Sequence, residues 1–169
     1  MKLVVSDSGP LHYLVLCEAI HVLPSLYGQL VIPSSVAEKL THAHAPTPVS
    51  AWIKSLPVWA SIQSAREIDA ATQLGLGERE AIALARELKA AELLVDERLA
   101  RKVAVQRGLL ITGTVGILEK AAERGLINLS EALQKLLRTN FRVDAQVIRE
   151  ALERDSARQR LSRERGLEH

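Results

Sequence analysis

Four acidic residues stand where predicted strands pass into predicted helices. Asp7 follows the apolar stretch "KLVVS", and Asp96 follows "ELLV". Glu38 lies six residues past a predicted strand over 29–32, and Glu78 opens the clearest predicted helix. Carboxylates gathered at one edge repel one another, so their grouping favours a cation between them, and hard oxygen ligands suit Mg²⁺ or Mn²⁺. Such an ion can activate water and stabilise the charge that develops on a phosphoryl group.

Each acid also has a structural explanation when it is taken alone. Asp7 could cap the helix that follows it, and Glu78 could interact with the dipole of its own helix from the first turn. Glu38 could be an ordinary surface charge. These explanations stay open for each single residue, and only the grouping of four acids favours a metal site.

Short apolar runs alternate with helical patterns through most of the chain. Strands are expected over Lys2–Ser6 and 29–32, over a weaker edge segment at 58–63, and in the apolar runs "ELLV" and "LLIT". Strands that alternate with helices predict an α/β fold whose parallel sheet carries helices on both faces. Sites in such sheets lie at the carboxyl ends of the strands, where two of the acids are expected. Pro46 and Pro48, in "THAHAPTPVS", predict a surface loop.

The composition is that of one compact domain. The chain has 169 residues, of which 47% are hydrophobic, so it can build a core without disulfides or a structural metal. Cys17 is the only cysteine, and no apolar stretch approaches the ~20 residues of a membrane span. The start of the chain lacks a signal-peptide pattern. We therefore expect a reducing, cytoplasmic location and no membrane partner.

Basic residues are concentrated toward the C-terminus. The net charge is only +2, but residues 138–165 hold eight arginines against five acids. We therefore divide the chain into a domain over 1–137, a basic helical segment over 138–166 that packs on it or extends from it, and an expression-tag remnant over 167–169. The basic segment could attract nucleic acid, or it could be a solvated helix with Glu–Arg pairs.

Five separated stretches, in this order, resemble the PIN-domain family: "VVSDSGPL", "LVIPSSVAEKL", "GLGEREAIALA", "LLVDERLARKVA" and "ITGTVGILEKAAERGLI". They most resemble a prokaryotic PIN-like branch of uncharacterised function, related to toxin ribonucleases of toxin–antitoxin pairs, over about residues 2–127. The resemblance implies a three-layer α/β/α PIN-like fold with a central, mainly parallel sheet and a metal-dependent endoribonuclease activity. It also implies that the catalytic acids, which are at the same time the ligands of Mg²⁺ or Mn²⁺, are Asp7, Glu38, Glu78 and Asp96.

The resemblance further implies an RNA substrate, a small antitoxin protein as a partner, and a homodimer. Ser8 is expected to support the acids by a hydrogen bond to a carboxylate or a phosphate, and Thr114 by orienting Asp7. Each of the two could instead simply cap a helix.

Basic residues follow the last of the four acids. Arg98, Arg101 and Lys102 are three or four apart, so they share one helix face. They could contact an RNA backbone, with Arg101 also supporting the acids, or they could form an ordinary solvated face.

Two other functions are considered. A catalytically silent RNA- or protein-binding PIN-like module would have the same fold but would not cleave RNA. A phosphatase or phospho-receiver built on an aspartyl phosphate would need a second acid two residues after Asp7, where this chain has Gly9, or a pair of acids before it, where the chain has Val5 and Ser6. His42 and His44 lack a third ligand at zinc spacing, so we expect them to be loop residues.

Overall fold

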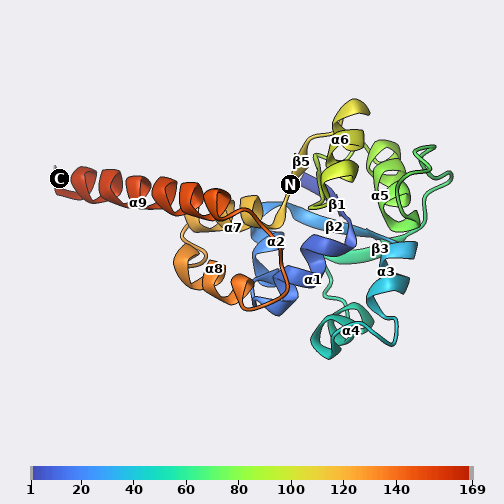
Figure 1. The fold of residues 1–169 in the computed structure, drawn as a ribbon, viewed down its shortest axis with the longest axis horizontal. Helices are drawn as coiled ribbons and strands as arrows, with labels where there is room; N and C mark the ends of the chain where they lie inside the picture. Colours follow the sequence, from blue (N-terminus) through green and yellow to red (C-terminus); the bar gives the residue numbers. More distant parts are fainter. Residues whose placement is uncertain (1, 168–169) are drawn as a thin grey trace.

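The computed structural model describes residues 2–167. Within these residues five strands form one sheet with parallel neighbours, in the order β3-β2-β1-β4-β5. The chain passes from β1 outward through β2 to β3, and then crosses to the other side of β1 for β4 and β5 (Figure 1). The strands are β1 (Lys2–Ser6), β2 (Gly28–Pro33), β3 (Ala60–Gln63), β4 (Glu92–Leu94) and β5 (Ile111–Thr112).

β1 is the central strand because both of its faces are apolar. Val4 and Val5 point to opposite faces, and both are fully buried. Val5 pairs in register with Val31 of β2 and with Leu93 of β4. A parallel strand covered on both faces requires a continuous hydrophobic run, which the letters "LVV" provide.

Helices cover both faces of the sheet, which gives three layers. The face that carries Val5 and Val31 is packed by α5 (Leu76–Glu87) and α6 (Arg98–Gln106). The other face carries Val4, and the predicted α/β/α fold is therefore confirmed. The elements around this second face are α1 (Ser8–Leu16), η1 (Ile20–Val22), α2 (Leu23–Leu26), α3 (Ser34–Leu40), α4 (Thr47–Lys54), α7 (Thr114–Glu123) and α8 (Leu129–Leu137).

Part of one predicted loop is a helix. α4 begins at Thr47, inside "THAHAPTPVS", and Pro48 lies in its first turn. Proline suits this position because first-turn N–H groups have no helical partner. The second proline, which predicted a loop, therefore marks a helix start. Trp52 of α4 lies beside Trp59, with ring centroids 6.0 Å apart, and both side chains pack against the core.

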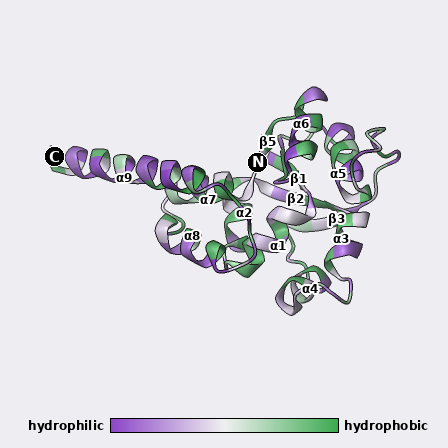
Figure 2. Cartoon of the chain, in the orientation of Figure 1, coloured by the Kyte–Doolittle hydropathy of each residue, from purple (hydrophilic) through white to green (hydrophobic). Residues whose placement is uncertain are grey.

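The C-terminal helix α9 (Ala145–Leu167) is anchored along its first half and then projects from the body (Figure 1). Ala151 is fully buried against the core, whereas every residue from 159 to 167 is exposed. Figure 2 shows many hydrophilic residues along this projecting part. No helix among residues 2–167 is both long and apolar enough to cross a membrane. Of the predicted tag remnant, residues 168–169 lie outside the described residues.

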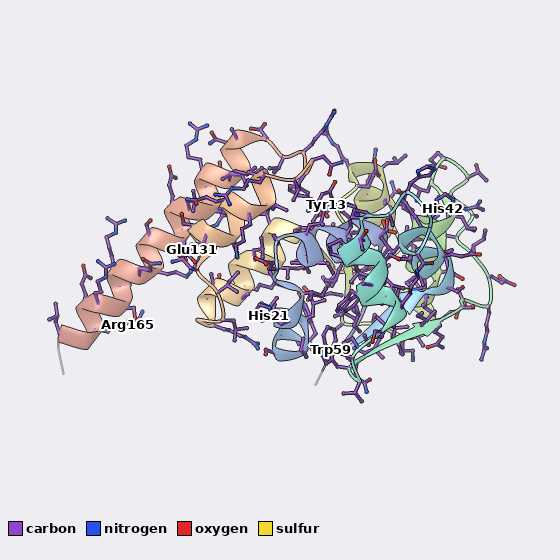
Figure 3. The ribbon with its side chains drawn as sticks, turned by 90° about the horizontal axis from the view of Figure 1, so that it is seen from below. Tyr13, His21, His42, Trp59, Glu131 and Arg165 are labelled. Carbon is purple, nitrogen blue, oxygen red and sulfur yellow. The ribbon has the colours of Figure 1, made fainter. Side chains whose placement is uncertain are left out.

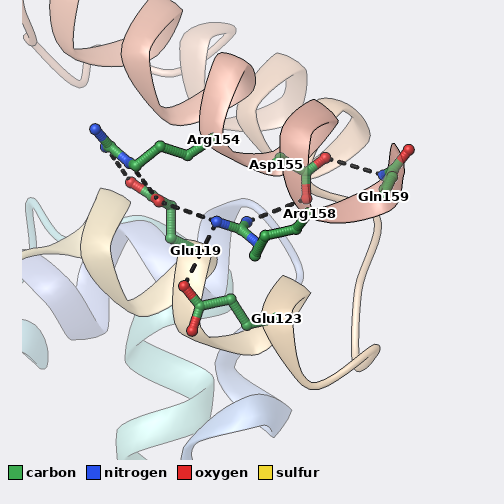
Figure 4. Close-up of polar contacts among 6 residues, drawn as sticks. All are labelled: Glu119, Glu123, Arg154, Asp155, Arg158 and Gln159. Carbon is green, nitrogen blue, oxygen red and sulfur yellow. Dashed lines mark hydrogen bonds and ion pairs between the residues drawn. The ribbon is translucent and has the colours of Figure 1, made fainter. Parts of the chain in front are cut away.

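Arginines of α9 pair with acids of α7 (Figure 4). Arg154 donates to both carboxylate oxygens of Glu119, at 2.6 and 3.0 Å. Arg158 lies 3.5 Å from Glu123 and 3.2 Å from Asp155. In the inner part of the basic segment, arginines therefore pair with acids of the domain and hold α9 on it.

Candidate active site

The central strand and its neighbour β4 both end in an aspartate. The Asp7 N–H donates to the Leu94 carbonyl at 2.9 Å, which holds the end of β1 against β4. Asp96 follows two residues after Leu94. The chain turns from one half of the sheet to the other at these strands, and α/β sheets bind ligands at the carboxyl edge of such a switch point.

Asp7 is a buried carboxylate for which no ion pair is formed among the described residues. The residue is 5% exposed. It occupies the N-cap position of α1, but its side chain makes no capping hydrogen bond, so capping does not explain its presence. Burial raises the pKa of the Asp7 carboxyl above its ordinary value of 3.8. The Ser8 N–H and Lys39 act in the opposite direction, and the charges of Asp96 and Glu97 raise the pKa further.

Three of the four predicted acids line one cavity. Asp7, Glu38 and Glu78 share a hollow of about 410 Å³ with Lys39 and the backbone around Gly77. Burial raises the pKa of the Glu78 carboxyl, and the charge of Asp7 raises it further. Glu38 is exposed on α3 at this cavity. The predicted grouping of these three residues is therefore present in the structure.

Asp96 is bound by Thr114 and lines a second cavity of about 390 Å³. The Thr114 N–H and hydroxyl donate to separate oxygens of Asp96, at 2.7 and 2.6 Å. The expectation that Thr114 orients Asp7 is wrong, because β5, which precedes Thr114, neighbours β4 and not β1. Burial raises the pKa of the Asp96 carboxyl, although the Thr114 hydrogen bonds and the charge of Arg101 partly offset this rise.

Two glycines allow the backbone to approach Asp96 closely. A Cβ atom at Gly113 would lie 2.9 Å from Oδ1 of Asp96, and a Cβ at Gly9 would lie 3.1 Å from Oδ2. A Cβ at Gly77 would lie 3.7 Å from Oδ1 of Asp7, which is ordinary contact. A side chain at Gly113 would therefore displace the Asp96 carboxylate, and glycine is needed there for space rather than for its backbone angles.

Basic residues flank the two cavities. Lys39 lines the first cavity, where its positive charge opposes the rise in carboxyl pKa caused by burial. Arg101 lines the second cavity. Arg98 and Lys102, the other predicted RNA contacts, are exposed on α6 and line neither one. Ser8 is buried in the first turn of α1, directly after Asp7.

Lys39 and Glu97 lie at the site, although neither is among the residues predicted from the sequence. Glu97 is the N-cap of α6, where its side chain accepts a hydrogen bond from the Ala100 N–H at 3.0 Å. Its charge also adds to the rise in the pKa of Asp7 that burial begins. Each residue directly follows a predicted acid, in "EK" and "DE". This adjacency is the feature of the sequence that could have identified them as site residues.

The acids fit a hard divalent cation in type. In residues 2–167 no three acidic, histidine or cysteine side chains converge closely enough to hold a metal ion. Burial nevertheless raises the pKa of the Glu78 carboxyl, the charge of Asp7 raises it further, and a cation would relieve that repulsion. Asp7, Glu38 and Glu78 line a common cavity, so they are the residues that would hold the ion.

A known family profile covers nearly the whole chain. The profile described as a PIN domain matches residues 3–157. Among solved structures, a PilT N-terminus domain protein from the hyperthermophilic archaeon Sulfolobus solfataricus P2 is 18% identical, with a TM-score of 0.46, over 85% of this chain and 100% of that chain. Comparison with curated proteins gave no match. Because the profile spans so much of the sequence, the chain belongs to the PIN domain family.

Proposed function

We propose that the chain is a metal-dependent endoribonuclease whose cutting site is the cavity lined by Asp7, Glu38 and Glu78. PIN domains are typically nucleases. The observation that carries the proposal is the burial of Asp7 without an ion-pair partner among the described residues, at a cavity that two further acids line. Burying an unpaired charge costs stability, so a functional role is the best explanation for its presence.

The residues of the chain could supply proton transfer and RNA placement. A carboxylate whose pKa is raised accepts a proton more readily near neutral pH, and Asp7 and Glu78 both have raised pKa values, chiefly through burial. Lys39 and Arg101 carry positive charge next to the acids, where they could hold the oxygens of a phosphodiester. A bound divalent ion would supply stabilisation of the phosphoryl charge and a lower pKa for water.

A catalytically silent RNA- or protein-binding module is the second candidate. One observation favours it, because both oxygens of Asp96 already accept hydrogen bonds from Thr114. Such a module would still bind RNA through the basic residues around the cavities, but it would not cut it.

Replacement of Asp7 by Asn should separate these two functions. Asp7→Asn keeps the size of the side chain but removes the anionic ligand and the proton acceptor, so RNA cleavage should be abolished while the fold stays intact. Cleavage of a mixed RNA pool is measured with Mn²⁺, with Mg²⁺ and with EDTA, and folding is checked by circular dichroism. The matched control is Asp144→Asn, because Asp144 is exposed and lines neither cavity.

Each result of this experiment has a definite meaning. Metal-dependent cleavage by the wild type and by Asp144→Asn, with none by Asp7→Asn, is the expected result. Cleavage that survives in Asp7→Asn or in EDTA would overturn the assignment to this cavity. RNA binding without cleavage by the wild type would identify the silent module.

A further inference from the structure

A third cavity adjoins the acidic one and has a different lining. This cavity, called here the His12 cavity, measures about 470 Å³ and lies between α1, the connection from α3 to α4, and Asn140. Lys39 and His42 line both it and the acidic cavity, so the two are neighbours. Its volume falls within the roughly 300–1,000 Å³ of small-ligand pockets.

Ring side chains line much of the His12 cavity. They are His12 and Tyr13 of α1, and His42 and His44 of the following connection. The rings of His42 and His44 lie 5.3 Å apart and are tilted by 31°. In Figure 3 Tyr13 and His42 lie in the upper part of the view, whereas His21 and Trp59 lie in the lower part. Flat rings of this kind are the groups on which unstacked bases are held by single-strand binding proteins.

The ring of Tyr13 is fixed in place by its neighbours. It meets His12 edge-on at 4.7 Å and Phe141 edge-on at 4.8 Å, and its hydroxyl donates to Oδ1 of Asn140 at 3.0 Å. A ring that is already ordered loses little conformational freedom when a ligand packs against it, so this wall of the cavity is prepared for binding.

His12 offers hydrogen-bonding capacity that suits a base edge. Burial lowers the pKa of the His12 imidazole, and the positive charge of Lys39 lowers it further. This lowering favours the neutral imidazole, which has one nitrogen that donates and one that accepts. The edges of nucleobases present donors and acceptors in the same way.

The shared wall between the two cavities connects the base site with the acids. Ser8 and Gly9 line the His12 cavity and follow Asp7 directly in the chain. An RNA chain with one phosphate at Asp7 would therefore place a flanking nucleoside beside His12, with Lys39 near the phosphate that joins them. Only single-stranded RNA could do so, because the bases of a duplex are stacked and paired.

We propose that the His12 cavity holds one unstacked base of a single-stranded RNA whose adjacent phosphate lies at the acidic cavity. This inference rests on the proposed function, since it assigns the position of the substrate at the same site. It makes His12 and His42 binding residues that decide which RNA positions are cut.

Binding in the absence of metal tests this inference without any cleavage. The probes are fluorescently labelled oligo-A, oligo-U and oligo-C RNAs, together with an abasic ribose-phosphate oligomer of the same length, all measured in EDTA. His12→Ala should weaken binding of the best oligonucleotide by about 5- to 150-fold, the effect of removing one base–aromatic interaction. Binding of the abasic oligomer should not change. His21→Ala is the matched control, because His21 is an exposed histidine outside the cavity.

A second variant keeps the test informative if His12→Ala unfolds the protein. His42→Ala changes an exposed side chain that lines the cavity from the connection between α3 and α4, and it should also weaken RNA binding. Thermal melting confirms that each variant is folded. Unchanged RNA binding by both variants, or an equal loss of binding to the abasic oligomer, would overturn the base site. The alternative occupant of the His12 cavity would then be a side chain of a protein partner. Base-dependent binding without metal-dependent cleavage would overturn only the nuclease proposal. Cleavage with unchanged binding would overturn only the base site.

Discussion

Asp7 and Glu80 are two buried acids in one domain with opposite electrostatic environments. Burial tends to raise the pKa of the Glu80 carboxyl, but hydrogen bonds outweigh this effect and the pKa is lowered. The donors include the Ser35 N–H at 2.8 Å, the Ser35 hydroxyl at 2.7 Å and the Ala65 N–H at 3.2 Å. Glu80 therefore stabilises the fold in its charged form, whereas the pKa of Asp7 is raised by burial and its charge opposes folding.

Asp7→Asn should stabilise the metal-free protein near neutral pH. Because its pKa is raised on folding, Asp7 contributes stability that is fully present below its ordinary pKa of 3.8 and is lost as the pH rises through the folded-state pKa. The melting temperature of Asp7→Asn should therefore exceed that of the wild type most near pH 7. The difference should shrink as the pH falls toward about 3.8. Thermal melting in EDTA across this range measures it.

Divalent metal should reverse this difference, so that the wild type melts at a higher temperature than Asp7→Asn. An ion that binds the folded state stabilises it by about 2.7 kcal/mol at a hundredfold excess over its dissociation constant, and Asp7→Asn should gain much less. The same melting curves are recorded with millimolar Mn²⁺. A wild type that melts no higher with Mn²⁺, together with an Asn variant that melts lower in EDTA, would show that Asp7 is a structural residue.

At the scale of elements, an ion pair between a buried aspartate and a partly exposed arginine fixes the segment that leads from β3 to α5. Asp69 is 6% exposed, and Arg107 of the α6 C-cap donates to both of its oxygens, at 2.9 and 3.0 Å. The Ala71 N–H donates to Asp69 Oδ1 at 2.9 Å, and Arg79 Nε donates to the Asp69 carbonyl at 2.7 Å. This network sets the position of the turn from which α5 presents Glu78 to the cavity.

Removal of the arginine should destabilise the fold in a pH-dependent way. Arg107→Ala should lower the free energy of unfolding, because it removes two hydrogen bonds to a buried carboxylate, and Arg107→Lys should lower it by less but not by zero, because lysine keeps the charge and lacks the two-pronged geometry. The hydrogen bonds from Arg107 lower the pKa of Asp69, so this stability is present above pH 3.8 and is lost as the pH falls through the folded-state pKa. Urea unfolding near pH 7 and near pH 3 measures both effects. Equal losses at the two pH values would contradict the assignment.

The sequence predicts the elements that carry the acids but not which elements become neighbours. The runs "KLVVS" and "ELLV" are local signals, and they place Asp7 and Asp96 at strand ends correctly. The partner of Thr114 depends on the order of the strands, which no local pattern contains, and the sequence reasoning therefore assigned it to the wrong aspartate. Glu78 and Glu80 both lie near the start of α5, and only hydrogen bonds from distant residues, Ser34, Ser35 and Ala65, distinguish the structural acid Glu80 from Glu78 at the cavity.

At the scale of the whole molecule, the C-terminal segment is part of the packed structure as well as an extension of it. Phe141 packs edge-on against Tyr13, and Ala151 is fully buried. Truncation after Leu137 would therefore remove core packing along with charge. Beyond Arg158 the residues of α9 are exposed, and no ion pair among the described residues involves Arg160, Arg163 or Arg165.

Truncation after Arg158 should reduce RNA affinity without reducing thermal stability. Removing one arginine–phosphate interaction lowers the slope of log affinity against log salt by about 0.7 for a single strand, so the removal of three arginines should lower it by at most about 2. Binding of a single-stranded RNA is measured over a series of KCl concentrations in EDTA. Arg154→Ala serves as the control, because Arg154 holds α9 on Glu119 and its replacement should lower the melting temperature instead. An unchanged salt slope would show that the end of α9 does not bind RNA.

The contact between Trp52 and Trp59 gives the chain an intrinsic optical probe. The sequence contains two tryptophans, so all of the tryptophan emission originates from one corner, where α4 meets the segment before β3. β3 is an edge strand with Ile62 exposed, and α4 follows the connection that carries His42 and His44. Fluorescence therefore reports on the corner where α4 lies beside the segment before β3, whereas far-ultraviolet circular dichroism reports on all of the helices. A fluorescence transition that precedes the dichroism transition during denaturation would reveal that this corner opens as a separate cooperative unit.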